Sequence, residues 1–122
     1  MKRILIIDDE VHILLMLKKM LEKAGYEVDL ARNGQEGIDL YNKSPVDLII
    51  TDIVMPEKEG LETIVDIKSK HPEIKIIAIS GGGRMDPREY LEPAKHFGAS
   101  KILKKPFNQK EIVSAVKELI GD

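Results

Sequence analysis

Residues 48–56 read LIITDIVMP, an apolar run that reaches the carboxylate of Asp52 and then stops at a proline. A continuous apolar run of this kind is typical of a strand that is buried on both faces of a sheet. Asp52 then stands at the carboxyl end of that strand, where open parallel sheets bind and process their ligands. We therefore expect Asp52 to be a nucleophile and the other active residues to be placed around it.

Length and composition narrow the class of protein. A chain of 122 residues is long enough for one domain, taken here as residues 1–122. The net charge of −2 provides no basic field for nucleic acid, and the lack of cysteine excludes disulfides, thiolate catalysis and Cys-ligated zinc. No apolar stretch approaches the ~20 residues that span a membrane. The short apolar run at residues 4–7 is followed by two acids, so it does not resemble a signal peptide. We expect a cytoplasmic protein.

Hydrophobic periodicity divides the chain into alternating strands and helices. Strands are expected at residues 4–7, 26–30, 48–52, 74–79 and 102–103, and helices at residues 10–23, 34–42, 61–70, 86–98 (interrupted at Pro93) and 109–120. Strands that alternate with helices predict a parallel sheet with helices on both faces, and right-handed crossovers limit its topology. Residues 26–30 alternate between apolar and polar, which suits an edge strand. The expected fold is a three-layer, doubly wound sandwich of five strands in the order 2-1-3-4-5.

Residues that can bind a metal or take part in catalysis stand at or just after the ends of four of the five expected strands. They are Asp8 and Asp9 after the first strand, Asp52 on the third, Ser80 on the fourth and Lys105 after the fifth. Because parallel strands all end at the same edge, these residues are expected to meet in one shallow cleft. Carboxylates that lie close together repel one another unless a cation neutralises them. A cluster of oxygen ligands without His or Cys selects a hard cation, and Mg²⁺ is the expected ion.

The remaining groups suit phosphoryl transfer. A lysine and a hydroxyl opposite the acids provide a cation and a hydrogen-bond donor for phosphoryl oxygens. A carboxylate is an established nucleophile for such a group, so the combination predicts an aspartyl phosphate at Asp52.

The same positions carry the resemblance to a known family. The chain resembles the CheY-like receiver domain of bacterial two-component response regulators over essentially its whole length, with every motif in order. The matching motifs are Asp8-Asp9-Glu10, Asp52 with Met55-Pro56, Gly60, Ser80-Gly81 and Lys105-Pro106-Phe107.

This resemblance implies a role for each residue of the site. Asp52 would accept a phosphoryl group from a phosphohistidine on a sensor histidine kinase or a histidine phosphotransfer protein. Asp9 and Asp52 would bind Mg²⁺ directly, the Val54 backbone carbonyl would be a third protein ligand, and Asp8 would act mainly through water. Ser80 and Lys105 would each contact a phosphoryl oxygen. The Lys105–Pro106 peptide bond is expected to be cis, as it commonly is in the family.

The chain also departs from the family pattern. The family has a switch aromatic residue three positions before the lysine, and its ring rotates when the hydroxyl residue, here Ser80, moves. In this chain Ile102 stands at that position, so there is no ring to rotate. The run Gly81–Gly83 makes the loop after the fourth strand unusual. Gly82 and Val54 stand where side chains tune dephosphorylation in the family. Neither side chain offers a polar group to position water, which predicts slow self-hydrolysis of the phosphorylated form.

Three alternative functions remain open. A haloacid dehalogenase-type phosphatase also uses a strand-end Asp, but it needs a second Asp two residues later, where this chain has Val54. A flavin or nucleotide binder should have a Ser/Thr/Gly-rich loop where Asp8 and Asp9 stand. A degenerate receiver that only docks partners would not need the full set of acids, hydroxyl and lysine.

A receiver of this kind implies two protein partners, one that donates the phosphoryl group and one that responds to the phosphorylated form. Besides the phosphodonor, we expect a downstream protein effector, no direct contact with nucleic acid or membrane, and a monomer or weak phosphorylation-dependent dimer.

Overall fold

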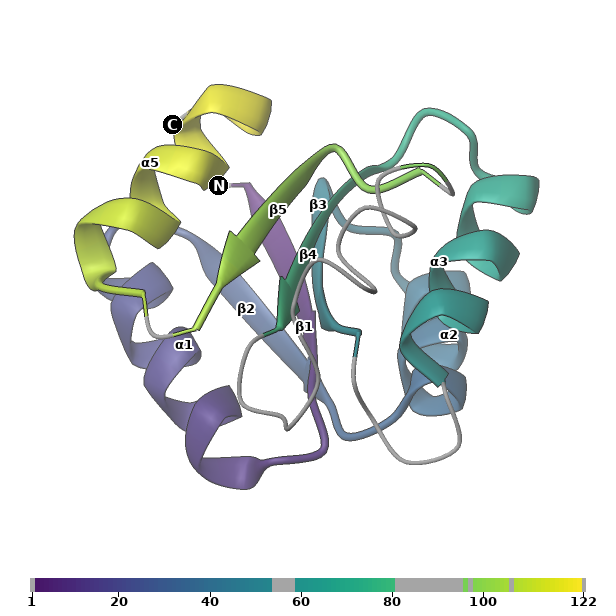
Figure 1. Ribbon diagram of the computed structural model, residues 1–122, viewed down its shortest axis with the longest axis horizontal. Helices are drawn as coiled ribbons and strands as arrows, with labels where there is room; N and C mark the ends of the chain where they lie inside the picture. The colour runs from purple at the N-terminus through teal and green to yellow at the C-terminus, as the bar shows by residue number, and fades with distance from the viewer. Residues whose placement is uncertain (1, 54–58, 81–95, 97, 106, 122) are drawn as a thin grey trace.

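The computed structural model describes residues 2–53, 59–80, 96, 98–105 and 107–121. Its parallel sheet has five strands in the order β2-β1-β3-β4-β5. Helices α1 and α5 cover one face of the sheet, and α2 and α3 cover the other (Figure 1). The strands are β1 (Arg3–Ile7), β2 (Glu27–Ala31), β3 (Leu48–Asp52), β4 (Lys75–Ser80) and β5 (Lys101–Lys104). The described helices are α1 (Val11–Lys23), α2 (Gly34–Lys43), α3 (Glu59–Lys70) and α5 (Gln109–Ile120).

The predicted fold class and strand order are confirmed. All five residues of β3 are buried, as expected of a central strand, whereas most of β2 at the edge is partly exposed. The predicted fourth helix, residues 86–98, lies largely outside the described residues. Helix α3 begins at Glu59, two residues before the predicted start, and β5 is four residues long where two were predicted.

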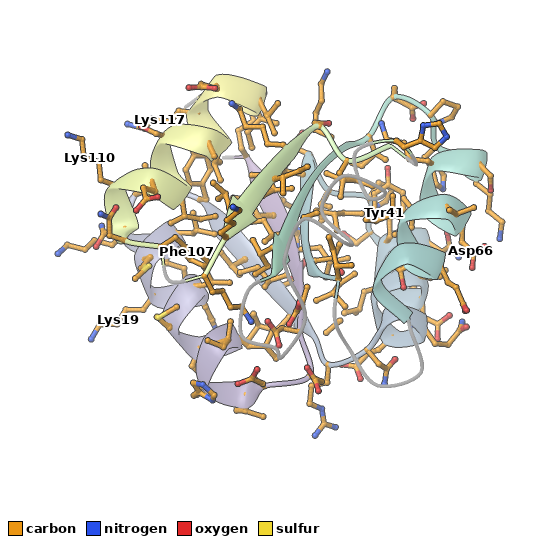
Figure 2. The ribbon with its side chains drawn as sticks, in the orientation of Figure 1. Lys19, Tyr41, Asp66, Phe107, Lys110 and Lys117 are labelled. Carbon is orange, nitrogen blue, oxygen red and sulfur yellow. The ribbon has the colours of Figure 1, made fainter. Side chains whose placement is uncertain are left out.

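Two apolar clusters hold the helices to the sheet. The first, here called the α2–α3 cluster, includes Ile7, Ile49 and Ala78 on one face. The second, here called the α1–α5 cluster, includes Ile6 and Ile50 on the other face. Neighbouring residues of a strand therefore belong to opposite clusters, as the pleat of a strand requires. Phe107 packs against the α1–α5 cluster, between the end of β5 and α1 (Figure 2).

Side-chain caps begin α2 and α5, and a glycine follows the end of α1. The Asn33 side chain accepts a hydrogen bond from the Glu36 backbone N–H at 2.8 Å. Asn108 and Glu111 form a reciprocal capping box at the start of α5, with distances of 2.8 and 3.2 Å. Gly25, with φ of +100°, ends the chain's first helical segment in a conformation that favours glycine.

Helix α2 lies close against β1 at Gly37. A Cβ atom at this position would lie 2.4 Å from Ile7 Cδ1 and 2.9 Å from Ile7 Cγ1, and Ile7 is completely buried. We expect Gly37→Ala to lower the free energy of unfolding by about 1–2 kcal/mol, because overpacking outweighs the gain of about 1 kcal/mol in helix propensity. Urea denaturation measures the change. Asn42→Ala, at an exposed position of the same helix, is the control and should leave stability nearly unchanged; an equal loss in both variants would contradict the packing argument.

Candidate functional site

The ends of β1 and β3 bring two carboxylates together. Ile7 pairs in register with Thr51, so Asp8 and Asp52 are the next residues on the two neighbouring strands. Both are buried, with 0% and 3% of their surface exposed. The backbone N–H of Asp8 donates to the Ala31 carbonyl at 3.1 Å, which holds Asp8 in line with the sheet. The predicted meeting of these acids at the carboxyl edge is therefore confirmed.

Lys105 reaches the same carboxylates from the far side of β4. Its Nζ donates a hydrogen bond to Asp52 Oδ2 at 3.2 Å and lies 3.6 Å from Asp8 Oδ2. The Lys105 side chain is only 16% exposed. Burial disfavours its positive charge, but the charges of Asp52 and Asp8 outweigh burial and raise the pKa of Lys105 above its ordinary value. Lys105 is therefore a cation at the site.

The surroundings of Asp8 disfavour the charged form of its carboxylate. Burial, together with the charges of Asp52 and Asp9, raises the pKa of Asp8 from 3.8 to about 6, although the Glu10 backbone N–H and Lys105 oppose this shift. Its Oδ1 accepts a hydrogen bond from the Glu10 N–H at 2.9 Å. Its Oδ2 is buried without a hydrogen-bond partner among the described residues. A buried carboxylate oxygen in this state is suited to a cation or a cation-bound water.

The acids form a set that suits a hard divalent cation. Asp8, Asp9, Glu10 and Asp52 each offer an oxygen, and these four atoms lie within 4.8 Å of one another. Asp9 and Glu10 are exposed, so the cluster opens to solvent on that side. Oxygen-only ligands favour Mg²⁺ or Ca²⁺ over softer metals. Glu10 was not predicted as a member of the cluster, although its place directly after the acidic pair could have suggested it.

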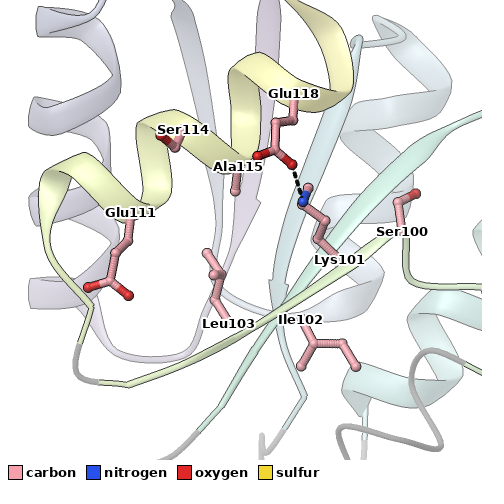
Figure 3. A pocket seen from close by; sticks show the side chains of 8 residues that line it. All are labelled: Ser100, Lys101, Ile102, Leu103, Glu111, Ser114, Ala115 and Glu118. Carbon is pink, nitrogen blue, oxygen red and sulfur yellow. Dashed lines mark ion pairs between the residues drawn. The ribbon is translucent and has the colours of Figure 1, made fainter.

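Other predicted site residues are placed only in part. Ser80 is the last residue of β4 and pairs in register with Lys104, next to the predicted lysine. The Val54 carbonyl, the Gly81–Gly83 loop and the Lys105–Pro106 bond involve residues outside the described part of the chain. Ile102 is partly buried against the α2–α3 cluster, and it points to the opposite side of β5 from Leu103, which packs toward α5 (Figure 3). The pair Lys101–Glu118 joins β5 to α5 on the Leu103 side (Figure 3).

The arrangement is suited to phosphoryl transfer. A buried carboxylate at a strand end can act as the nucleophile, a cation site adjoins it, and a lysine stands opposite to balance the charge of a transferred group. No helix in the described part of the chain is long and apolar enough to cross a membrane.

Comparison with known proteins agrees with a site for phosphoryl transfer. The chain matches the model of the response regulator receiver domain over residues 4–117. It is 36% identical over 119 residues to the chemotaxis protein CheY of Thermotoga maritima and covers 97% of each protein. It is 32% identical over 120 residues to the transcriptional regulatory protein CpxR of Escherichia coli, covering 98% of this chain but only 50% of CpxR. A solved receiver domain protein from Clostridium thermocellum superimposes with a TM-score of 0.90 at 31% identity, covering 98% of this chain and 94% of that one.

The chain belongs to the response regulator receiver domain family. It is thus a phosphoacceptor signalling domain of a two-component system, which favours this function over the phosphatase alternative. It works as a phosphorylation-activated switch rather than as a conventional enzyme. An aspartyl phosphate and Mg²⁺ bound at an acidic pocket are general features of the family, as are interactions with histidine kinases and downstream effectors. The chain spans about half the length of CpxR and nearly all of CheY.

Proposed function

We propose that Asp52 is the phosphoacceptor of this domain and that residues 1–122 act as one receiver unit. The observation that carries the proposal is the buried Asp52 carboxylate, held by Lys105 Nζ at 3.2 Å beside the acidic cluster. The donor is a phosphohistidine of a sensor histidine kinase or a histidine phosphotransfer protein.

The chemistry is an in-line displacement at phosphorus. A carboxylate oxygen of Asp52 forms the new O–P bond while the P–N bond of the phosphohistidine breaks, and its electron pair stays on the imidazole nitrogen. Lys105 moves from the Asp52 carboxylate to an oxygen of the transferred group. Asp9, Asp52 and the Val54 carbonyl would hold Mg²⁺ directly, and Asp8 would hold it mainly through water. When bound, Mg²⁺ offsets the negative charge of the carboxylates and of the phosphoryl oxygens.

The response to phosphorylation starts from the neighbouring strands. Ser80 at the end of β4 donates a hydrogen bond to the new phosphoryl group and draws the following loop inward. Ile102 stands two strands from Asp52 and takes the place of the family's switch aromatic. A branched aliphatic side chain cannot swing as a ring does, so the movement of the loop is passed on by packing against the α2–α3 cluster.

The surface beside the site offers apolar contacts to a donor. The apolar side chains of Val11 and Leu15, in the first half of α1, are 52% and 56% exposed. Val11 lies only two residues after Asp9, so a helix that carries the phosphohistidine can pack on α1 while its imidazole reaches the cleft. The output goes through a protein effector, and the domain acts in the cytoplasm as a monomer or a weak phosphorylation-dependent dimer.

Incubation with acetyl phosphate and Mg²⁺, followed by intact mass measurement, tests the proposal. We expect one phosphoryl adduct per chain, which requires Mg²⁺ and disappears when EDTA replaces the metal. Peptide mapping after borohydride reduction should place the modification at Asp52. A phosphoryl group on another residue, or no adduct under conditions where a known receiver is labelled, would contradict the proposal.

Dephosphorylation should be slow. Val54 and Gly82 offer no polar side chain to position the attacking water, so spontaneous hydrolysis lacks general-base assistance. We expect the phosphorylated form to last many minutes at neutral pH with Mg²⁺, as measured by loss of the mass adduct after the donor is removed. Val54→Glu or Gly82→Glu should shorten that lifetime. A lifetime of seconds in the unmodified chain would count against this reasoning.

A further inference from the structure

Thr51 places a hydroxyl group in an otherwise apolar layer. Ile49 and Ile53 belong to the α2–α3 cluster, so Thr51 between them faces the same side of the sheet. Its neighbours in register, Ile7 and Ala78, are members of the same cluster. Thr51 is fully buried. A valine would have the same shape without a polar atom to desolvate, so the hydroxyl at this position calls for an explanation.

The hydroxyl is used by the residue that follows it. Thr51 Oγ1 donates a hydrogen bond to the backbone carbonyl of Asp52 at 3.1 Å. The N–H of the same peptide group, which belongs to Ile53, donates to the Ile79 carbonyl of β4 at 3.0 Å. The peptide group between Asp52 and Ile53 is therefore held at its oxygen by Thr51 and at its nitrogen by the neighbouring strand.

This peptide group is the last part of β3 before the chain leaves the sheet. Its orientation sets the backbone angle ψ of Asp52 and, through it, the direction in which the chain leaves the sheet at Ile53. The Asp52 side chain leaves the adjoining Cα on the other face of the sheet, where it meets Lys105 at 3.2 Å. A small rotation of the peptide group would displace the following chain relative to the carboxylate.

We propose that Thr51 is a positioning residue for the phosphoacceptor: its hydroxyl fixes the Asp52–Ile53 peptide group and thereby the relative placement of the nucleophile and the chain that follows it. The inference rests on the proposed function, because it assumes that Asp52 is the residue that reacts. Thr51 acts from the opposite face of the sheet and does not touch the transferred group.

Three substitutions separate the hydroxyl from the packing. Thr51→Val removes the hydroxyl and keeps the shape. Thr51→Ser keeps the hydroxyl and removes the methyl group. Ile49→Val is the matched control, because it removes one methylene from a fully buried residue on the same face of β3 and leaves the hydrogen bond intact.

The measured quantity is the rate of adduct formation with acetyl phosphate and Mg²⁺. We expect the rate for Thr51→Val to fall about fivefold, equivalent to about 1 kcal/mol of activation free energy. Thr51→Ser and Ile49→Val should react within about twofold of the unmodified chain, whatever their stability. The carbonyl ¹³C resonance of Asp52 should move upfield in Thr51→Val, as expected when a carbonyl loses a hydrogen bond, and should stay near its original position in Thr51→Ser.

The outcomes distinguish this inference from the proposed function. No adduct in the unmodified chain contradicts the proposed function itself. An adduct in the unmodified chain together with an equal rate in Thr51→Val overturns only the role of Thr51. Equal slowing in Thr51→Val and Ile49→Val also overturns it, since packing alone would then explain the effect. If Thr51→Val does not fold, Thr51→Ala removes the hydroxyl without adding bulk, and the same comparison with Thr51→Ser decides.

Discussion

Asp52→Asn is expected to abolish phosphorylation by acetyl phosphate. An amide oxygen carries no negative charge and is a far weaker nucleophile toward phosphorus than a carboxylate oxygen. The change preserves size, and Lys105 can still donate to the remaining oxygen at this position. Intact mass measurement with Mg²⁺ should therefore detect no phosphoryl adduct, even though circular dichroism shows a folded protein.

An exposed acid provides the matched control for this substitution. Asp66→Asn makes the same chemical change on α3, where the side chain is exposed and does not belong to the acidic cluster. It should leave the rate of adduct formation unchanged. An adduct in Asp52→Asn at the rate of the unmodified chain would mean that another residue is the acceptor.

Much of the fold could be predicted because local patterns and sheet geometry agree. The uninterrupted apolar run at residues 48–52 indicated a central strand, and the alternation at residues 26–30 indicated an edge strand. Parallel strands end at one edge, so the meeting of Asp8, Asp52 and Lys105 followed from the fold alone. These predictions depend on the period of the sequence, which the backbone imposes directly.

Other features depend on packing that the sequence does not display. The spacing of apolar residues in α1 does not show that Val11 and Leu15 lie outside the core while Leu14 and Leu17 lie inside. A residue at the margin of the apolar face of a helix can be either buried or exposed. Which of the two occurs depends on how the helix is rotated about its axis against the sheet. The place of Glu10 in the acidic cluster was not predicted either, because it depends on the conformation of the turn that joins β1 to α1.

The hydrogen bond of Thr51 illustrates a further limit. A threonine within an apolar strand reads as an ordinary β-branched residue of a sheet. Only the register of β1, β3 and β4 shows that its hydroxyl has an apolar environment on both sides. The polar partner, the carbonyl of the next residue, becomes apparent when the side chain is placed.

Asp8 is expected to make the metal-free domain less stable as the pH rises. Its pKa is raised from 3.8 in the unfolded chain to about 6 in the folded one, so the folded state binds more protons between these values. Stability is therefore lost as the pH rises from about 4 to about 6, by about 3 kcal/mol for a difference of this size. The difference in free energy of unfolding between Asp8→Asn and the unmodified chain isolates this contribution, because the other titrating groups are common to both.

Urea denaturation in EDTA at about pH 4.5, near the lower end of this range, and at about pH 8, well above its upper end, measures that difference. Asp8→Asn should be the more stable protein by about 2–3 kcal/mol at the higher pH, where the unmodified chain holds a buried charge, and the gap should narrow at the lower pH. Mg²⁺ should reverse the order at high pH, because a cation that binds only the folded state stabilises the protein with the intact carboxylate more strongly. A gap that does not change with pH would show that Asp8 does not titrate in this range. A gap that closes with pH but ignores Mg²⁺ would leave Asp8 as a buried acid without a role in holding the ion.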